Sequence, residues 1–267
     1  MSHIGVFDSG LGGLTGYRAL RELLPAHDLV YFGDNARVPY GTKSREVICR
    51  YALQDTRFLL SRDVRAVLVA CGTVSSNALE LLQERFDVPF VGVVSPAAEA
   101  AVRIASAKNG KILVLGTAAT VKSGAYEKAI RALDASVEVA SVACPMFVPL
   151  AENGHTQKGD VAATAITHKY LDPYMDFHAD AVILGCTHFP LLSDVISSVL
   201  PTPALVSAGA ESARAMAELV GAQLPDGGCG TDAFYTSDDP ASFAENACRF
   251  LGHPLGVNVS KVDIETY

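Results

Sequence analysis

Short apolar segments alternate along the chain with longer segments of helical periodicity, and this alternation restricts the fold more than any other feature. The longer segments 44–63, 74–86, 119–133 and 158–178 have the length of crossover helices. Repeated strand and helix units of this kind are typical of α/β proteins with parallel sheets. The eight apolar segments that we expect to be strands are 4–7, 28–32, 66–70, 89–94, 111–116, 136–142, 181–185 and 204–207.

Composition excludes several classes of protein. The chain has 267 residues, 49% of them hydrophobic, so it can bury a large core. Its formal net charge is −8 and no run of Lys and Arg occurs, which argues against nucleic acid or a membrane surface as a partner. None of the six cysteines forms a C-x-x-C pair, so we expect free thiols in a reducing compartment. Residues 1–7 contain no basic segment and no long apolar run, and we therefore expect a cytoplasmic protein without a signal peptide.

A weak internal repeat indicates two similar domains. Four short segments recur in the same order, at offsets between 108 and 115 residues. We expect two open parallel-sheet α/β domains related by pseudo-symmetry, with the active site in the cleft between them. Residues 1–94 and 209–267 are expected to form the first domain, and residues 95–208 the second. The equivalent pairs are Ser9 and Thr117, Pro39 and Pro149, Cys71 and Cys186, and Pro89 and Pro203.

Reactive side chains directly follow several of the expected strands. Open parallel sheets bind ligands at the carboxyl ends of their strands, so these side chains are candidates for one site. If the two domains face each other, Cys71 and Cys186 approach a shared cleft from opposite sides. The residues at strand ends are Asp8, Ser9 and Gly10; Cys71, Gly72 and Thr73; Gly116 and Thr117; and Cys186, Thr187 and His188.

Two opposed thiols suit the inversion of a stereocentre next to a carboxylate. One group must remove the hydrogen from one face, while the other returns a proton to the opposite face. An unperturbed cysteine has a pKa of about 8.5, so the thiolate and the thiol are both accessible near neutral pH. Cys71 and Cys186 are therefore candidates for a base and an acid that exchange roles with the direction of the reaction.

Other interpretations of the same residues stay open. A cysteine at the end of an apolar strand is most often a small buried hydrophobe. Cys71, Cys186 and His188 have the residue types of a zinc site, although their spacing matches no standard metal motif. The segment 8–10 is also compatible with a plain strand-to-helix turn or with a phosphate cradle, but it lacks a G-x-G-x-x-G pattern and a Walker lysine. Arg37 is expected to make a surface or loop contact rather than a substrate contact.

Six motifs together carry a resemblance to a known family. "GVFDSGLGGLT", "YFGDNARVPYG", "VACGT", "LGTAAT", "VPLAENG" and "ILGCTHFPLL" occur in this order between residues 4 and 192. This set resembles the glutamate racemases of the aspartate/glutamate racemase family, which are isomerases that supply D-glutamate for bacterial peptidoglycan. The resemblance covers about the first three quarters of the chain, and it implies an enzyme that interconverts L- and D-glutamate without a cofactor.

The resemblance also implies roles for particular residues. The thiols that match Cys71 and Cys186 are the family's acid/base catalysts, the first acting on D-glutamate and the second on L-glutamate. Asp8 and His188 match residues that assist the nearby thiols, and Glu152 matches one that supports the histidine. The implied partner is the small-molecule substrate glutamate; no metal, no cofactor, no nucleic acid and no membrane is expected, and a homodimer is compatible with the sequence. The implied substrate contacts are Asp8, Ser9, Tyr40, Gly41, Gly72, Thr73, Thr117, Thr120, Thr187 and His188.

The chain departs from the family pattern beside the first thiol. The usual Cys-Asn-Thr is replaced by Cys71-Gly72-Thr73, which removes an amide that contacts the ligand. A backbone N–H or Asn77 is expected to replace it, and because glycine leaves open space, Gly72→Asn is expected to fold. A related racemase of aspartate or another acidic substrate stays an alternative, as does a small-molecule binding protein without catalysis.

Overall fold

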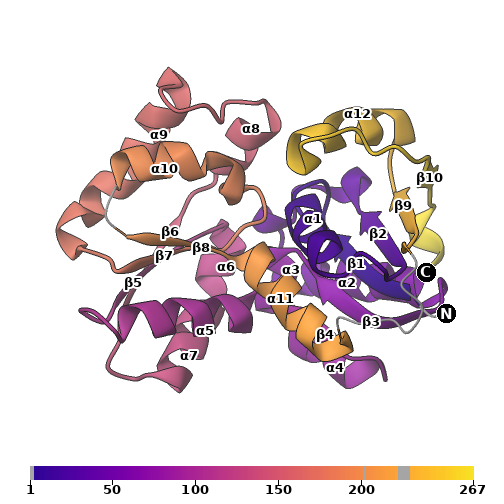
Figure 1. Ribbon diagram of the computed structural model, residues 1–267, viewed down its shortest axis with the longest axis horizontal. Coiled ribbons are helices and arrows are strands. Elements are labelled where there is room, and N and C mark those ends of the chain that lie inside the picture. The colour runs from indigo at the N-terminus through magenta and orange to yellow at the C-terminus, as the bar shows by residue number, and fades with distance from the viewer. Residues whose placement is uncertain (1–2, 201–202, 222–228) are drawn as a thin grey trace.

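Two fully parallel sheets form the framework of the protein, which we describe from a computed structural model over residues 3–200, 203–221 and 229–267 (Figure 1). The first sheet has the strand order β10-β9-β2-β1-β3-β4, and the second has the order β6-β5-β7-β8. The predicted pair of parallel-sheet α/β domains is therefore confirmed. The strands of the first sheet are β1 (His3–Asp8), β2 (Leu29–Gly33), β3 (Val64–Val69), β4 (Phe90–Gly92), β9 (Asp232–Thr236) and β10 (Val259–Lys261). Those of the second are β5 (Lys111–Gly116), β6 (Glu138–Ala143), β7 (Ala181–Leu184) and β8 (Ala204–Ser207).

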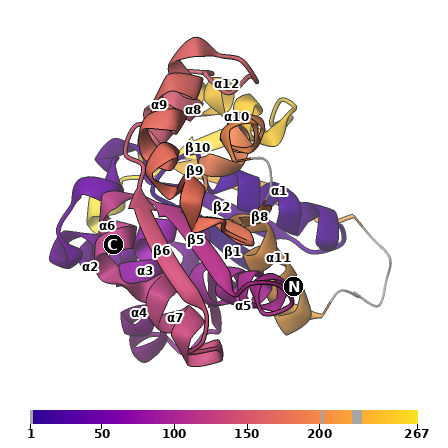
Figure 2. The ribbon, with the colours of Figure 1, turned by 90° about the vertical axis from the view of Figure 1, so that its left-hand side faces the viewer.

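Helices cover both faces of each sheet. Figure 2 shows α9 and α10 on one side of the second sheet and α5 and α7 on the other. The helices are α1 (Leu14–Leu23), α2 (Arg45–Leu60), α3 (Gly72–Asn77), α4 (Leu79–Arg85), α5 (Val94–Ala105), α6 (Ala118–Ser123), α7 (Ala125–Leu133), α8 (Phe147–Glu152), α9 (Val161–Leu171), α10 (Ser193–Val199), α11 (Ala208–Val220) and α12 (Pro240–Leu251). The 3-10 turns are η1 (Asn35–Arg37), η2 (Tyr40–Thr42), η3 (Asp172–Phe177), η4 (Phe189–Leu192) and η5 (Ile264–Thr266).

The central strands β1, β2, β5 and β7 are almost continuously apolar because both of their faces are buried. Neighbouring residues of one strand enter different cores: Tyr31 packs among residues of α1, α11 and α12, whereas Phe32 packs on the opposite face with Phe58 of α2. All eight predicted strands are present, with ends shifted by a few residues. The two-residue period of side-chain direction thus divides a continuous apolar run between two cores.

Three predicted helices are interrupted. The segment 74–86 is divided at Ala78 into α3 and α4, and 158–178 continues from α9 into the 3-10 turn η3. The segment 119–133 is divided at Gly124, which has φ +64° and ends α6 before α7 begins. Glycine adopts this left-handed conformation without the steric cost of a Cβ atom, so it reorients the chain there.

The segment after residue 208 extends the first sheet. The parallel strand β9 pairs with β2 and β10 pairs with β9, and neither strand was predicted (Figure 1). Helix α11 packs against α1, which belongs to the core of the first sheet, and against α5, which packs on β7 of the second sheet. The domain boundaries at residues 94 and 208 stay a prediction.

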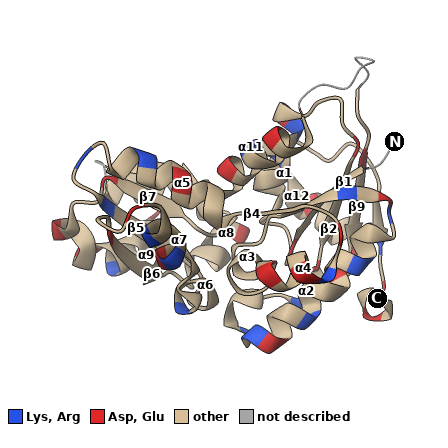
Figure 3. Cartoon of the chain, turned by 90° about the horizontal axis from the view of Figure 1, so that it is seen from below, with Lys and Arg blue, Asp and Glu red and all other residues tan. Residues whose placement is uncertain are grey.

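In the view of Figure 3, basic and acidic residues are interspersed along the outer helices. Among residues 3–200, 203–221 and 229–267, no helix combines the length and the apolar character needed to cross a membrane.

Replacement of Phe234 tests whether β9 is an integral part of the first core. Phe234 is buried, and its ring centroid lies 5.0 Å from that of Tyr17 and 6.0 Å from that of Tyr31. Phe234→Ala is expected to lower the free energy of unfolding by about 3–5 kcal/mol, measured by urea denaturation. The control Val257→Ala, at a 44% exposed position, is expected to stay within about 0.5 kcal/mol of the unsubstituted protein. Equal stability of the two variants would contradict this packing.

Candidate active site

The two sheets bring Cys71 and Cys186 together because the backbones that carry them are in contact. Cys71 follows β3 and precedes the first residue of α3, while Cys186 follows β7 before the turn η4. A Cβ atom built on Gly72 would lie only 2.1 Å from the carbonyl oxygen of Gly185. Residues next to the two thiols thus touch across the sheets, and both thiols are buried.

A cavity of about 380 Å³ lies between the sheets at these strand ends. Both thiols border it, so the predicted cleft exists and contains both candidate catalysts. Asp8 and Thr120 lie behind the cavity wall, both buried. Of the predicted site residues, those that border the cavity are Ser9, Tyr40, Gly41, Cys71, Gly72, Thr73, Thr117, Glu152, Cys186, Thr187 and His188.

Cys71 is held in its protonated form. Burial raises the pKa of its thiol to about 12, and the negative charge of Asp8 acts in the same direction. The thiol donates a hydrogen bond to the Ser9 hydroxyl at 3.5 Å. At neutral pH, Cys71 is therefore an acid that can deliver a proton into the cavity.

Asp8 has one carboxylate oxygen without a partner. Its Oδ2 accepts the Gly10 N–H at 2.9 Å, while its Oδ1 is buried and has no hydrogen bond. An unpaired buried carboxylate oxygen is unfavourable until it meets a donor. Beside a cavity, this atom suits a thiol proton or the ammonium group of a ligand.

A different set of groups surrounds Cys186. Its Sγ lies 3.8 Å from Nδ1 of His188, whose Nε2 lies 3.0 Å from Oε1 of Glu152. Burial opposes protonation of the imidazole, but the hydrogen bonds to Cys186 and Glu152 and the charges of Cys186 and Asp8 outweigh it and raise the pKa of His188 to about 10. The ring stands edge-on to Phe250, with centroids 5.3 Å apart, which restricts its rotation. His188 can therefore exchange a proton with the Cys186 thiol from a constrained position.

A chain of hydroxyl groups crosses the cleft from the first sheet to the second. Oγ1 of Thr73 and Oγ1 of Thr117 are 3.0 Å apart, and Thr120 lies 3.0 Å beyond Thr117. The carbonyl of Thr187 accepts a hydrogen bond from Thr15, so its backbone is fixed. Thr73, Thr117 and Thr187 thereby present neutral polar groups to the cavity, and the Thr117 hydroxyl donates to Thr120 behind it.

The turn η2 provides another part of the wall. The hydroxyl of Tyr40 is bonded to Asp34 and Asp55, which leaves the backbone of the turn as the part available to a ligand. Gly41 lies against Thr117, because a Cβ atom at this position would be 2.9 Å from Cβ of Thr117. The turn therefore contacts the second domain directly.

The structure corrects two expectations about the Cys71-Gly72-Thr73 segment. The space beside Gly72 is closed rather than open, since a Cβ atom would overlap the backbone of Gly185, so the expectation that Gly72→Asn is tolerated is wrong for this arrangement. Asn77 does not border the cavity: its amide donates to the Thr73 carbonyl at 2.8 Å and to Ser76 at 3.0 Å. Asn77 therefore stabilises α3 and does not replace the missing family amide.

Arg37 departs from its expected place on the surface. It does make a loop contact and does not border the cavity, but its side chain is only 8% exposed and pairs with buried Asp34 and Asp55. Asn35, Pro145 and Val148 also border the cavity, although they were not among the predicted site residues. The sequence pointed to them only through their positions within or next to the motifs "YFGDNARVPYG" and "VPLAENG".

The described parts of the chain contain no group of three or more His, Cys, Asp and Glu side chains arranged to hold a metal ion. The zinc interpretation of Cys71, Cys186 and His188 therefore receives no geometric support.

Comparison with known proteins relates this cavity to a family. The sequence pattern of the Asp/Glu/Hydantoin racemases matches residues 4–216. The chain belongs to this family. It is 44% identical to the glutamate racemase of Geobacter metallireducens over 266 residues, which are 98% of this chain and 97% of the relative. The predicted site residues, from Asp8 to His188, all lie within the matched range.

Solved structures of glutamate racemases share the whole architecture. The enzyme of Francisella tularensis, crystallised with D-glutamate, superimposes with a TM-score of 0.91 at 32% identity and covers 100% of this chain and 99% of its own. The enzyme of Thermus thermophilus, crystallised with β-chloro-D-alanine, gives a TM-score of 0.88 at 40% identity, with 100% and 98% covered. These two glutamate racemases therefore share the two-sheet architecture that forms the cavity.

The contact between Gly72 and Gly185 can be tested with the smallest side chain. Gly72→Ala is expected to separate the two strand ends, to raise the KM for the substrate and to lower the stability by about 1–3 kcal/mol. Gly16→Ala is the matched control, because a Cβ atom at that helical position has its nearest neighbour at 3.6 Å. The control is expected to keep its KM. Unchanged KM and stability in Gly72→Ala would show that the strand ends are not in contact.

The contribution of Glu152 to His188 predicts a pH dependence. Because folding raises the pKa of His188 to about 10, its protonation stabilises the folded state fully below about pH 6.5, and this contribution is lost as pH rises toward 10. Glu152→Gln is expected to lower the pKa of His188, so that the stabilising contribution of the protonated imidazole disappears at a lower pH. The imidazole NMR titration reports it directly. Glu80→Gln, which removes an exposed carboxylate on α4, serves as the control and is expected to leave the titration unchanged.

Proposed function

We propose that the protein interconverts L-glutamate and D-glutamate, with Cys71 and Cys186 acting on opposite faces of the α-carbon. The observation that carries this proposal is the presence of both thiols in one cavity, each contributed by a different sheet. The glutamate racemases that resemble this chain over nearly its whole length support glutamate as the substrate. A binding protein without catalysis has no need of two opposed thiols.

In the direction from L- to D-glutamate, the Cys186 thiolate removes the α-proton and Cys71 returns a proton to the opposite face. The C–H electron pair stays on the α-carbon until the Cys71 proton arrives, so one proton is taken and one is given. The raised pKa of the Cys71 thiol supports its role as the acid in this direction. After the turnover Cys186 carries a proton and Cys71 does not, and the reverse reaction uses the same groups in exchanged roles.

The polar groups of the cavity divide between the charged groups of the amino acid. The unpaired Oδ1 of Asp8 lies behind the cavity wall, and it suits the ammonium group once a small shift of that wall exposes it. The Ser9 hydroxyl, which accepts from Cys71, keeps its own proton for a carboxylate. The hydroxyls of Thr73 and Thr117 can reorient toward the second carboxylate. His188 and Glu152 hold a proton next to Cys186. They can take the proton that Cys186 has gained, which returns Cys186 to the thiolate that the next turnover from L-glutamate requires.

The same proposal places the protein in the cytoplasm, where D-glutamate enters the precursors of bacterial peptidoglycan. The small-molecule partner is glutamate, and the reaction requires no metal and no pyridoxal phosphate. A homodimer stays a prediction from the sequence.

Exchange of the α-hydrogen with solvent tests the function directly. Protein dialysed against a chelator is incubated with either enantiomer in deuterated water, and the α-proton signal is followed by NMR together with the optical rotation. Exchange and racemisation of glutamate without any added cofactor are expected. A preference for aspartate, or activity that appears only after pyridoxal phosphate or a metal is added, would overturn the proposal.

Single substitutions of the thiols test the division of labour between them. Cys71→Ser and Cys186→Ser are each expected to reduce racemisation by more than the ~10²–10⁴-fold typical of one acid/base group, because every turnover needs both thiols. Residual α-hydrogen exchange is expected to favour L-glutamate in Cys71→Ser and D-glutamate in Cys186→Ser. Cys248→Ser, at an exposed position, is the control and keeps full activity. Near-normal racemisation by either active-site variant, or the same preferred enantiomer in both, contradicts the two-thiol mechanism.

A further inference from the structure

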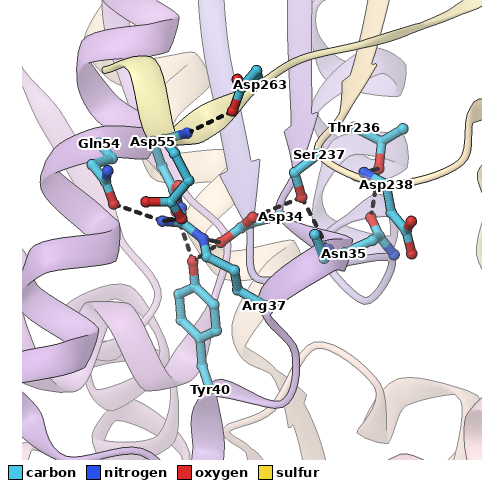
Figure 4. Close-up of polar contacts among 12 residues, drawn as sticks. Asp34, Asn35, Arg37, Tyr40, Gln54, Asp55, Thr236, Ser237, Asp238 and Asp263 are labelled. Carbon is cyan, nitrogen blue, oxygen red and sulfur yellow. Dashed lines mark hydrogen bonds and ion pairs between the residues drawn. The ribbon is translucent and has the colours of Figure 1, made fainter.

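A buried polar cluster lies directly behind the turn η2, outside the cavity (Figure 4). Asp34 follows β2, Arg37 is in η1, Tyr40 is in η2, and Asp55 is in α2. The side chains of Asp34 and Asp55 are fully buried, and that of Arg37 is 8% exposed. Two carboxylates and one guanidinium thus share a site from which water is excluded.

Asp34 is the carboxylate with the larger number of donors. Its Oδ2 accepts from Nε of Arg37 at 2.6 Å and lies in hydrogen-bond contact with the Tyr40 hydroxyl. Its Oδ1 accepts from the Ser237 hydroxyl at 2.7 Å. Both oxygens of Asp34 are therefore occupied by donors, as an ionised carboxylate requires.

Asp55 has fewer donors than it needs as an anion. Its Oδ1 accepts from Nη2 of Arg37 at 2.9 Å, and its Oδ2 lies 3.1 Å from the Tyr40 hydroxyl oxygen. The single proton of that hydroxyl can serve Asp34 or Asp55, but not both. If it points to Asp34, the contact between Asp55 and Tyr40 is a hydrogen bond only when Asp55 itself carries a proton.

The cluster connects the C-terminal segment to the wall of the cleft. Ser237, which follows β9, accepts the Ala36 N–H at 2.9 Å while it donates to Asp34. On the other side, Tyr40 and its neighbour Gly41 border the cavity, and Gly41 lies against the second domain. A displacement of Tyr40 therefore moves the wall of the substrate cavity.

We propose that Asp55 is a neutral carboxylic acid that donates to Tyr40, that Tyr40 donates to ionised Asp34, and that this chain of hydrogen bonds positions the Tyr40–Gly41 wall of the substrate cleft. Arg37 joins the two ends of the chain and balances the one negative charge. Asp34, Arg37 and Asp55 are thus positioning residues. Their effect on substrate binding rests on the proposed racemase function, because it is exerted through the cavity wall that they hold in place.

The electrostatics of the cluster agree with this distribution of protons. Burial raises the pKa of Asp55 well above its usual range, and the charge of Asp34 adds to the effect, while Arg37 and Tyr40 oppose it. On the far side of Arg37, the Glu265 carboxylate of η5 is 68% exposed and lies 3.2 Å from the guanidinium. Solvent screens that third carboxylate, so the buried positive charge is matched by Asp34 alone.

Two asparagine substitutions distinguish the neutral acid from the ionised one. In Asp55→Asn the amide oxygen can accept from Arg37 and the amide N–H can donate to Tyr40, which reproduces the protonated acid. In Asp34→Asn the N–H₂ group meets donors, and the negative charge is lost.

Asp55→Ala is expected to raise the KM for glutamate about ten-fold with a smaller change in kcat, as loss of a charge-assisted bond predicts. Asp55→Asn is expected to restore KM to within about two-fold of the unsubstituted enzyme, while Asp34→Asn is expected to raise it at least as much as Asp55→Ala.

An unfolding experiment tests the proton on Asp55 without any assay of activity. Because folding raises the pKa of Asp55, its contribution to stability is present below the ordinary carboxyl pKa of about 4 and is lost as pH rises through the folded pKa. Asparagine does not titrate. The stability of the unsubstituted protein relative to Asp55→Asn is therefore expected to fall as pH rises above about 4.

The outcomes separate this inference from the proposed function. An equal rise in KM in Asp55→Asn and Asp34→Asn, or a rise in KM in Asp55→Asn alone, would overturn the assignment of the proton to Asp55. A stability difference that is constant with pH, or that changes with the opposite sign, would also overturn it, even if Asp34→Asn does not fold. An unsubstituted protein that fails to racemise glutamate would reject the proposed function, while the expected pH slope in the same protein would still support the neutral Asp55.

Discussion

The contact between the backbones of Gly72 and Gly185 is the constraint on which the site depends. The two sheets belong to different parts of the chain, and a cleft between them narrows only as far as their strand ends permit. Because Gly72 has no side chain, the carbonyl oxygen of Gly185 can occupy the space that a Cβ atom would need. The thiols on the flanking residues then face one shared cavity instead of two separate surfaces.

Inside this cavity, different surroundings prepare two identical side chains for different tasks. Cys71 lies near the carboxylate of Asp8, and burial keeps its proton in place. Cys186 lies beside the protonated imidazole of His188. The pseudo-symmetry of the fold therefore does not extend to the electrostatics of the site. A racemase needs this difference, since one thiol must give a proton when the other accepts one.

The parts of the fold that follow from local pattern could be predicted, and the parts that depend on remote contacts could not. The apolar runs of β1, β2, β5 and β7 could be predicted as strands because both of their faces are buried. The strands β9 and β10 were missed because polar residues shorten their apolar runs, and their strand conformation depends on pairing with β2 and with each other. Helix α7 begins anew at Gly124, whose positive φ no periodicity reveals.

By itself, the sequence determined the identity of the reactive groups and their places after strands, because strand ends and motifs are local properties. The tertiary structure alone decided that Gly72 leaves no room for a larger residue, and that Asn77 supports a helix instead of a ligand. It also decided that Arg37 is buried between two carboxylates. These features depend on distances between segments far apart in the chain and on the exclusion of water. The hydrogen bonds among Asp34, Tyr40 and Asp55 likewise form only after folding brings separate segments together, so no single segment of the sequence predicts them.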